Sequence, residues 1–308
     1  MMHYLIFVLA LSGLLLSARY FTSSAETIGK FLGLPTFVIG VFIVGIGTSL
    51  PELISGIISV RKGASEILAG NIIGANISNI LLITGLAVVL NKKNIALSSG
   101  YMYIDLHYLI GSFFFFYVIA YDGKIEILEA FFGIIMFLFY SIYLIKGEAS
   151  NSPKQVKKSV PFPITASGLL LLSAIGIYFA ADFTISTLEK IAVDLAVPKS
   201  IVALTLLSLG TTLPELAVNV SAIRQGKAEM AIGNVLGSCI FNTLVIPTVA
   251  SLFGKISVTP NLLHFSLPVM AACGLLFYLL TQDKKISIWE GLMFICLYGV
   301  FIVKTATE

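Results

Sequence analysis

The sequence predicts an all-α membrane protein with about ten transmembrane helices, arranged as two inverted five-helix repeats. Of its 308 residues, 57% are hydrophobic and only 11% are charged, whereas charged residues make up about a quarter of an ordinary soluble domain. The apolar runs are about 20 residues long, which lets a helix cross a hydrocarbon layer of ~30 Å. They lack the ten-residue alternation of an outer-membrane barrel. A third observation, a motif that occurs twice, predicts the two repeats.

Polar breaks divide the chain into ten expected spans. The first apolar run has no basic segment before it, so we interpret it as a retained helix rather than a signal peptide. The longest polar stretch, KGEASNSPKQVKK, separates five spans from five. We therefore expect a first repeat at residues 1–146, a cytoplasmic linker at 147–162 and a second repeat at 163–308. The spans are expected at residues 2–18, 35–60, 67–90, 102–121, 125–145, 163–181, 198–223, 228–253, 262–281 and 286–304.

The two halves share a motif. Residues 45–52 read GIGTSLPE and residues 208–215 read SLGTTLPE. At a constant offset of 163, residues 45–79 and 208–242 share 14 identities without a gap, mostly glycine, proline and polar residues. Shared apolar composition does not produce such matches, so the chain contains an internal duplication. Because five spans is an odd number, the second repeat enters the membrane from the opposite side, as in many secondary transporters.

The basic residues predict the orientation. Of the 19 lysines and arginines, twelve fall in the loops that are cytoplasmic if both termini lie outside. Cytoplasmic loops of membrane proteins are enriched in basic residues. We therefore expect both termini outside, with the linker in the cytoplasm.

Each copy of the motif places a glutamate, Glu52 or Glu215, inside an apolar span. A carboxylate in the middle of a membrane costs about 2.5–3.5 kcal/mol even on the lenient insertion scale. No lysine or arginine lies near the middle of a predicted span, so a proton or a bound cation must neutralise each glutamate. The duplication of the whole surrounding motif favours the cation.

The residues beside each glutamate provide further oxygen ligands. Pro51 and Pro214 have no N–H, so each frees the carbonyl four residues earlier, at Gly47 and Gly210. We expect these four residues to break their helices. Carboxylate, carbonyl and hydroxyl oxygens suit hard ions such as Ca²⁺ and Na⁺, and no cofactor is expected. The hydroxyls are those of Thr48, Ser49, Thr211 and Thr212.

The span after each glutamate contains GNIIGANISN (residues 70–79) or GNVLGSCIFN (residues 233–242). Glycines four residues apart allow close helix packing. Asn79 and Asn242 lie well inside these spans, where an amide oxygen can bind a cation without adding charge. Hydrogen bonding between helices is at least as good an interpretation of three other asparagines, Asn71, Asn76 and Asn234.

Together these motifs closely resemble the two α-repeats of the sodium/calcium exchanger branch of the cation/Ca²⁺ antiporters, in its prokaryotic form. The resemblance implies ten helices, in which broken second and seventh spans cross the third and eighth around a central site. It further implies that Glu52 and Glu215 are shared by Ca²⁺ and Na⁺, and that the following residues complete the ligands: carbonyls of Thr48, Thr211, Gly45 and Ser208, hydroxyls of Ser49, Thr212 and Ser238, and amides of Asn79 and Asn242.

Two positions depart from that family pattern. Several family members have an aspartate where this chain has Asn242, and a serine where it has Ala75. The two remaining carboxylates neutralise one Ca²⁺, whereas three Na⁺ would leave one surplus positive charge. Fewer Na⁺, a co-transported K⁺ or protons on the glutamates all stay open.

The chain has no long cytoplasmic insert, so we expect no regulatory Ca²⁺-binding domain. Membrane lipid is an expected partner and nucleic acid is not.

The expected function is secondary antiport of Na⁺ and Ca²⁺ by alternating access, in the plasma membrane of a microbe. A proton-coupled Ca²⁺ antiporter and a K⁺-dependent Na⁺/Ca²⁺ exchanger are the alternatives, and a passive channel fits inverted repeats less well. An enzyme would need an activated nucleophile or a metal-held water. His3, His107 and His264 lie near span ends and give Ser49 no evident base. We therefore do not expect an enzyme.

Overall fold

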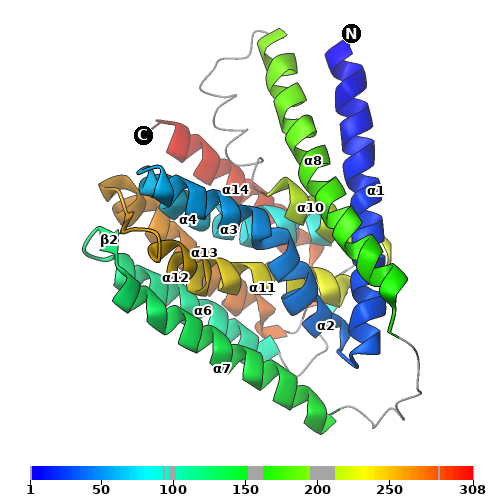
Figure 1. Cartoon of the computed structure of the whole chain (residues 1–308), viewed down its shortest axis with the longest axis horizontal. Coiled ribbons are helices and arrows are strands. Elements are labelled where there is room, and N and C mark those ends of the chain that lie inside the picture. Colours follow the sequence, from blue (N-terminus) through cyan, green and yellow to red (C-terminus); the bar gives the residue numbers. More distant parts are fainter. Residues whose placement is uncertain are drawn as a thin grey trace.

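The computed structural model describes residues 2–92, 94–96, 102–151, 162–194, 212–283 and 285–307. It is mostly helical (Figure 1). By length and composition, eight helices in these residues can cross a membrane, and a shorter apolar helix covers Ile104–Ala120. The prediction of a helical integral membrane protein is therefore confirmed.

The described residues of the first half form five helical stretches, two of which combine α-helix with π-helix. The π-helical segments are named η1 and η2. In chain order the elements are α1 (Met2–Phe31), α2 (Thr36–Ile39), η1 (Gly40–Gly45), α3 (Ile46–Arg61), α4 (Ser65–Ser78), η2 (Asn79–Ile83), α5 (Thr84–Asn91), α6 (Met102–Ala120) and α7 (Ile127–Asn151).

The described residues of the second half follow a similar order. A π-helical segment, η3, precedes α13, and a short 3₁₀ helix, η4, follows it. The elements are α8 (Ile164–Asp194), α10 (Leu213–Arg224), α11 (Ala228–Leu244), α12 (Ile246–Ser251), η3 (Leu262–Ser266), α13 (Leu267–Leu280), η4 (Thr281–Asp283) and α14 (Ile288–Thr307).

Two helices, α1 and α8, are longer than predicted. The predicted spans ended at residues 18 and 181, but the helices continue to Phe31 and Asp194. Polar residues suggested these ends, and several of them are satisfied inside the helix. The Thr22 hydroxyl donates to the Ala18 carbonyl and the Thr184 hydroxyl donates to the Ala180 carbonyl, each at 2.7 Å. Such bonds let a polar side chain remain within an apolar helix.

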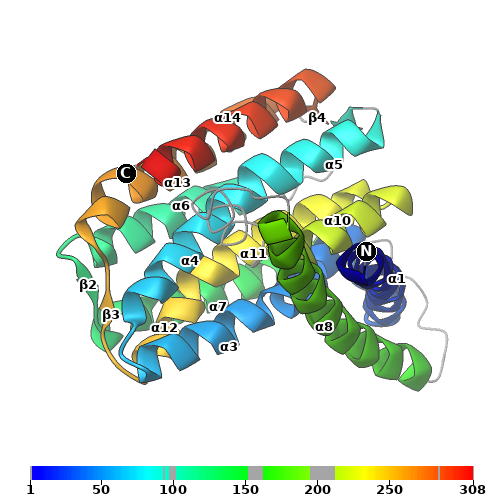
Figure 2. The same ribbon diagram turned by 90° about the horizontal axis from the view of Figure 1, so that it is seen from above.

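Helices α1 and α8 pack side by side and run steeply across the remaining helices (Figures 1 and 2). Small residues permit this contact: a Cβ added to Gly176 would lie 2.6 Å from the Ser17 hydroxyl. The pair has an apolar cluster of its own, which includes Leu14, Phe21 and Ile177. The outer faces of both helices are exposed, as expected for surfaces that contact lipid.

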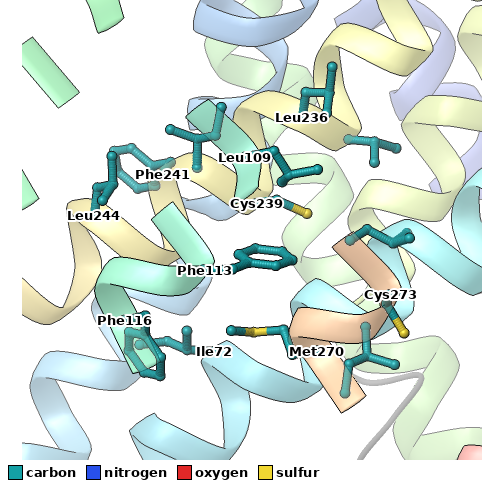
Figure 3. Packing of buried hydrophobic residues seen from close by; sticks show 14 of the residues in the cluster. Ile72, Leu109, Phe113, Phe116, Leu236, Cys239, Phe241, Leu244, Met270 and Cys273 are labelled. Carbon is teal, nitrogen blue, oxygen red and sulfur yellow. The ribbon is translucent and has the colours of Figure 1, made fainter. Parts of the chain in front are cut away.

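The main hydrophobic core surrounds α11, whose apolar stretch is buried completely. Figure 3 shows Phe113 of α6 between α11 and α13. A Cβ on Gly274 of α13 would lie 2.8 Å from the Phe113 ring, so this glycine makes room for the aromatic side chain. Large apolar side chains of α4, α6, α11 and α13 thus hold the buried helix that carries much of the second motif.

Within the described ranges, two short antiparallel strand pairs lie in the loops, and they were not predicted. β1 (Ile95–Ala96) pairs with β4 (Lys285–Ile286), and β2 (Lys124–Ile125) pairs with β3 (Ile256–Ser257). Each pair joins one half of the chain to the other. Two-residue strands are too short to show the alternation by which a strand is recognised.

An exposed ion pair accompanies the second strand pair. Lys255 Nζ lies 2.7 Å from Glu126 Oε1 and Lys124 Nζ lies 3.4 Å from it. The hydrogen bond from Lys255 holds the pKa of Glu126 below its ordinary value. Exposed pairs of this kind contribute little to stability.

Polar contacts anchor α1 to the turn between α10 and α11. Lys227 Nζ and Lys30 Nζ each lie 2.7 Å from a carboxylate oxygen of Glu26. The Ser23 hydroxyl donates to Gln225 Oε1 at 3.0 Å. Only 13% of the Lys227 side chain is exposed, against 67% for Lys30. The contact with Lys227 is therefore the better shielded from water.

We expect Lys227→Gln to lower the melting temperature by a few degrees, because it removes a partly buried ion pair worth about 1 kcal/mol. Lys30→Gln is the matched control, since it removes the exposed pair of the same Glu26. Thermal unfolding of the two purified variants is the measurement. An equal or larger loss in Lys30→Gln would contradict the anchoring role of Lys227.

Candidate functional site

The helix that carries Glu52 differs from the expectation in the position of its irregular segment. Gly47 and Pro51, predicted to break the helix, lie inside the continuous α-helix α3. The irregular backbone is η1, which ends just before α3 begins. Pro51 lacks one hydrogen bond to the carbonyl of Gly47, but the neighbouring bonds of α3 persist. The prediction of a break at Gly47 and Pro51 was therefore wrong.

In the second half, Pro214 lies in the first turn of α10, where the missing N–H leaves no hydrogen bond unmade. Thr212 is the N-cap residue of this helix and is buried. Three predicted site residues, Ser208, Gly210 and Thr211, lie outside the described residues. The expected break at Gly210 and Pro214 therefore stays a prediction.

Segments α2 and η1 pack against α11 backbone to backbone. A Cβ added to Gly233 would lie 2.3 Å from the carbonyl oxygen of Phe37 in α2, and one added to Gly237 would lie 2.5 Å from the carbonyl oxygen of Val41 in η1. From the other side, a Cβ on Gly40 would lie 2.3 Å from the Met230 carbonyl oxygen. These distances confirm the close packing expected of Gly233 and Gly237.

Gly70 and Gly74 of the first half are placed differently. Among the described residues, a Cβ on Gly70 would meet only the Leu262 side chain, at 3.8 Å, and one on Gly74 would meet nothing within 4 Å. Both glycines border a cavity of about 570 Å³ between α3, α4 and α14. In the second half, Gly233 and Gly237 pack against η1 or the residues just before it. The segment that the offset of 163 equates with η1, residues 203–208, lies outside the described part of the chain.

The two glutamates are buried next to each other. Glu52 of α3 and Glu215 of α10 are 4% and 2% exposed, and they lie close enough to interact electrostatically. One oxygen of each carboxyl group, Oε2, has no hydrogen-bond partner among the described residues. Neither glutamate takes part in a salt bridge there. Burial without compensation is costly for such groups.

A hydrogen-bonded cluster joins η1 and α3 to α11. The Ser238 hydroxyl donates to the Gly45 carbonyl at 3.2 Å, and the Thr48 hydroxyl lies 3.2 Å from Asn234 Oδ1 and 3.5 Å from the Ser238 hydroxyl. The Thr48 side chain also interacts with the Glu215 carboxyl group. The fold thus brings Gly45, Thr48, Ser238 and Glu215 together, and adds Asn234.

Other predicted ligands are buried polar atoms without a partner among the described residues. They are 0–1% exposed, and their atoms are Ser49 Oγ, Asn79 Oδ1 and Nδ2, and Asn242 Oδ1. Asn79 begins η2, where its backbone carbonyl accepts a hydrogen bond from Thr84 at 3.1 Å. Its side chain lies near the Cys239 thiol of α11 but makes no hydrogen bond of good geometry with it.

Sequence reasoning missed Asn219. It is 1% exposed, its Nδ2 donates to the Glu215 carbonyl at 2.9 Å, and its Oδ1 has no partner among the described residues. The offset pairs Asn219 with Gly56, so the duplication does not identify it. Its position one helical turn after Glu215 is the signal that could have done so.

The arrangement is suited to binding a dehydrated hard cation. Its buried acceptors are carboxylate, amide, hydroxyl and carbonyl oxygens, which are the ligands preferred by Ca²⁺ and Na⁺. Oxygens left without donors inside a protein are the atoms that a cation would satisfy. In the described part of the chain, no group of three or more His, Cys, Asp or Glu side chains forms a separate metal site.

Comparison with known proteins gives consistent results. A family model described as sodium/calcium exchanger protein matches residues 2–146 and 165–305. Sodium/calcium exchanger MaX1 of Methanosarcina acetivorans is 32% identical, over 98% of this chain and 97% of that protein. Uncharacterized membrane protein MJ0091 of Methanocaldococcus jannaschii is 30% identical, over 96% and 95%. A structure of the sodium-calcium exchanger NCX_Mj superposes with a TM-score of 0.85 at 28% identity, covering 98% of both chains.

Proposed function

This chain belongs to the sodium/calcium exchanger family and is a cation/Ca²⁺ antiporter, and we propose that it exchanges Na⁺ for Ca²⁺ by alternating access. The carrying observation is the pair of buried glutamates, each with one carboxyl oxygen that lacks a partner among the described residues. Ca²⁺ and Na⁺ would compete for these two carboxyl groups. Because they cannot occupy the same ligands at once, influx of one is coupled to efflux of the other.

We assign Glu52 and Glu215 as the central ligands. The cluster around Thr48 and Ser238 supports flanking sites, because the Thr48 side chain interacts with Glu215 and its hydroxyl lies near the Gly45 carbonyl and the Ser238 hydroxyl. Buried, unpartnered amide oxygens support Asn79 and Asn242 as ligands, and we add Asn219 on the same ground. The remaining proposed ligands are Gly45, Ser49, Ser208, Thr211 and Thr212.

The charge of the site limits its occupants. Two carboxylates balance one Ca²⁺ without a further acidic ligand. Asn242 supplies an oxygen but no charge, so three Na⁺ would leave the site positively charged. We therefore propose that fewer than three Na⁺ exchange for one Ca²⁺. K⁺-dependent exchange and exchange against protons remain the alternatives for the coupling ion.

Several features support two inverted repeats in this fold. The offset of 163 moves β1 to within two residues of β3 and β2 to within two residues of β4, and the observed pairs are β1 with β4 and β2 with β3. A twofold relation exchanges these two pairs with each other. In addition, the regular α-helix is interrupted at or soon after the two equivalent asparagines, Asn79 and Asn242. The π-helical segment η2 begins at Asn79, and α11 ends two residues after Asn242.

Alternating access requires one group of helices to move against another. Helices α1 and α8 pack on each other and cross the remaining helices, so we propose that they slide as a pair (Figure 1). In that motion the contacts of Glu26 and Ser23 with residues 225 and 227 would break and re-form. We further propose a plasma-membrane location with both termini outside.

The function is tested by uptake of radiolabelled Ca²⁺ into proteoliposomes loaded with Na⁺ and diluted into Na⁺-free buffer. We expect uptake that requires internal Na⁺, because the outward Na⁺ gradient drives Ca²⁺ inward. One control replaces internal Na⁺ by K⁺, a second adds K⁺ to internal Na⁺, and a third imposes only a pH gradient. Uptake driven by the pH gradient alone would overturn Na⁺ coupling in favour of proton coupling.

A further inference from the structure

A third buried carboxyl group lies away from the Glu52–Glu215 pair. Asp105 is in the first turn of α6, within the apolar segment Ile104–Ala120, and its side chain is fully buried. Neither of its carboxyl oxygens has a hydrogen-bond partner among the described residues. The offset of 163 pairs Asp105 with Pro268, so this residue is not part of the duplicated site. The exchange mechanism proposed above does not use it.

The groups that interact with Asp105 are tyrosines. Tyr140 of α7 is fully buried, its hydroxyl has no hydrogen bond of good geometry in the described structure, and its side chain interacts with Asp105. Tyr143, also of α7, interacts with Asp105 and with Tyr108 of α6. The Tyr108 and Tyr140 rings lie 4.9 Å apart. The cluster therefore joins α6 to α7.

Among the described residues, no lysine or arginine forms a salt bridge with Asp105, and the side chains that interact with it are tyrosines. The nearby His107 contacts the Tyr278 ring of α13, with ring centroids 5.6 Å apart. A helix N-terminus favours an ionised aspartate, but by less than the penalty for burying an unpaired charge. An ionised Asp105 is thus disfavoured here.

A proton neutralises Asp105 better than a metal ion does. Ca²⁺ takes six to eight oxygen ligands, whereas this cluster offers one carboxyl group and tyrosine hydroxyls. Except in the last turn of an α-helix, the backbone carbonyls accept hydrogen bonds within the helix. They are therefore not free to complete a coordination shell. A protonated carboxyl group, by contrast, needs only one acceptor for its O–H. The Tyr140 hydroxyl can be that acceptor.

We propose that Asp105 binds a proton in the folded protein and that its carboxyl O–H donates a hydrogen bond to the Tyr140 hydroxyl. The proton is taken from water when the helices pack, and it returns to water when Asp105 ionises. This proton site is separate from the ion site of the exchanger. Alkaline conditions therefore weaken the packing of α6 on α7 whether or not protons take part in transport.

Infrared spectroscopy of the purified full-length protein at neutral pH tests the proposal. We expect Asp105→Asn to remove one carbonyl band of a protonated carboxylic acid. Asp283→Asn, an exposed aspartate in η4, is the matched control and should leave that band unchanged. Tyr140→Phe retains Asp105 but removes its acceptor, so it should shift the same band. This variant keeps the proposal testable if Asp105→Asn does not fold.

Thermal unfolding provides a second readout. Between mildly acidic and alkaline pH, the melting temperature of the wild type should fall more steeply than that of Asp105→Asn, because only the wild type must ionise a buried acid.

In the infrared spectra, loss of a carboxylate band instead of a carboxylic acid band in Asp105→Asn would overturn the proposal. If that variant also lost a thermal stabilisation by Na⁺ or K⁺, a metal ion would be the ligand of Asp105.

Discussion

Replacing Glu52 or Glu215 by glutamine should abolish Ca²⁺ transport while leaving the protein folded. Each substitution removes one of the two charges that balance Ca²⁺ in the proposed site. Removing one partner of a buried charge pair costs about 2–5 kcal/mol, so we expect Ca²⁺ affinity to fall at least ~30-fold. Glutamine has nearly the same shape as glutamate, and it does not bury a potential charge. The measurements are Na⁺-driven Ca²⁺ uptake in proteoliposomes and the melting temperature of the same preparations.

Glu126→Gln is the matched control for these variants. Glu126 is partly exposed and directly follows β2, where it pairs with Lys255, so its loss should leave transport unchanged. The double variant of Glu52 and Glu215 should transport no more Ca²⁺ than either single variant. Wild-type uptake in both single variants would show that the cation site lies elsewhere.

Gly237→Ala should destabilise the protein strongly. The new Cβ would lie 2.5 Å from the Val41 carbonyl oxygen and 2.7 Å from the Val41 Cα, far inside ordinary contact distance. These atoms are backbone, so no side-chain rotation relieves the clash, and η1 must move away from α11. Overpacking of this kind typically costs about 1–3 kcal/mol. The shift would also separate Thr48 from Ser238, so we expect both melting temperature and Ca²⁺ uptake to fall.

Gly299→Ala, in α14, is the control for the glycine variant. No described atom lies within 4 Å of the position of its added Cβ. Alanine is favoured over glycine inside a helix by about 0.5–1 kcal/mol, so this variant should be as stable as the wild type or slightly more stable. Equal melting temperatures for the two glycine variants would contradict a tight contact between η1 and α11.

The amino-acid sequence by itself determined the membrane class, the two halves and the main candidate residues. Hydropathy over about 20 residues is a local property, so it reveals spans without knowledge of their packing. The duplication identified Glu52 and Glu215 because two copies of a glutamate in an apolar helix are costly unless they have a role. It also identified Asn79 and Asn242, and all four side chains are buried.

Only the tertiary structure decided how the two halves meet. The irregular segment is η1 rather than Gly47–Pro51, and η1 lies against Gly233 and Gly237 nearly 200 residues further along the chain. Asn219 and Asp105 have no counterpart in the other repeat, so the duplication could not identify them. They are distinguished by burial and by the absence of hydrogen-bond partners for their side-chain oxygens in the described residues. Both properties depend on contacts between distant segments, which local sequence patterns do not encode.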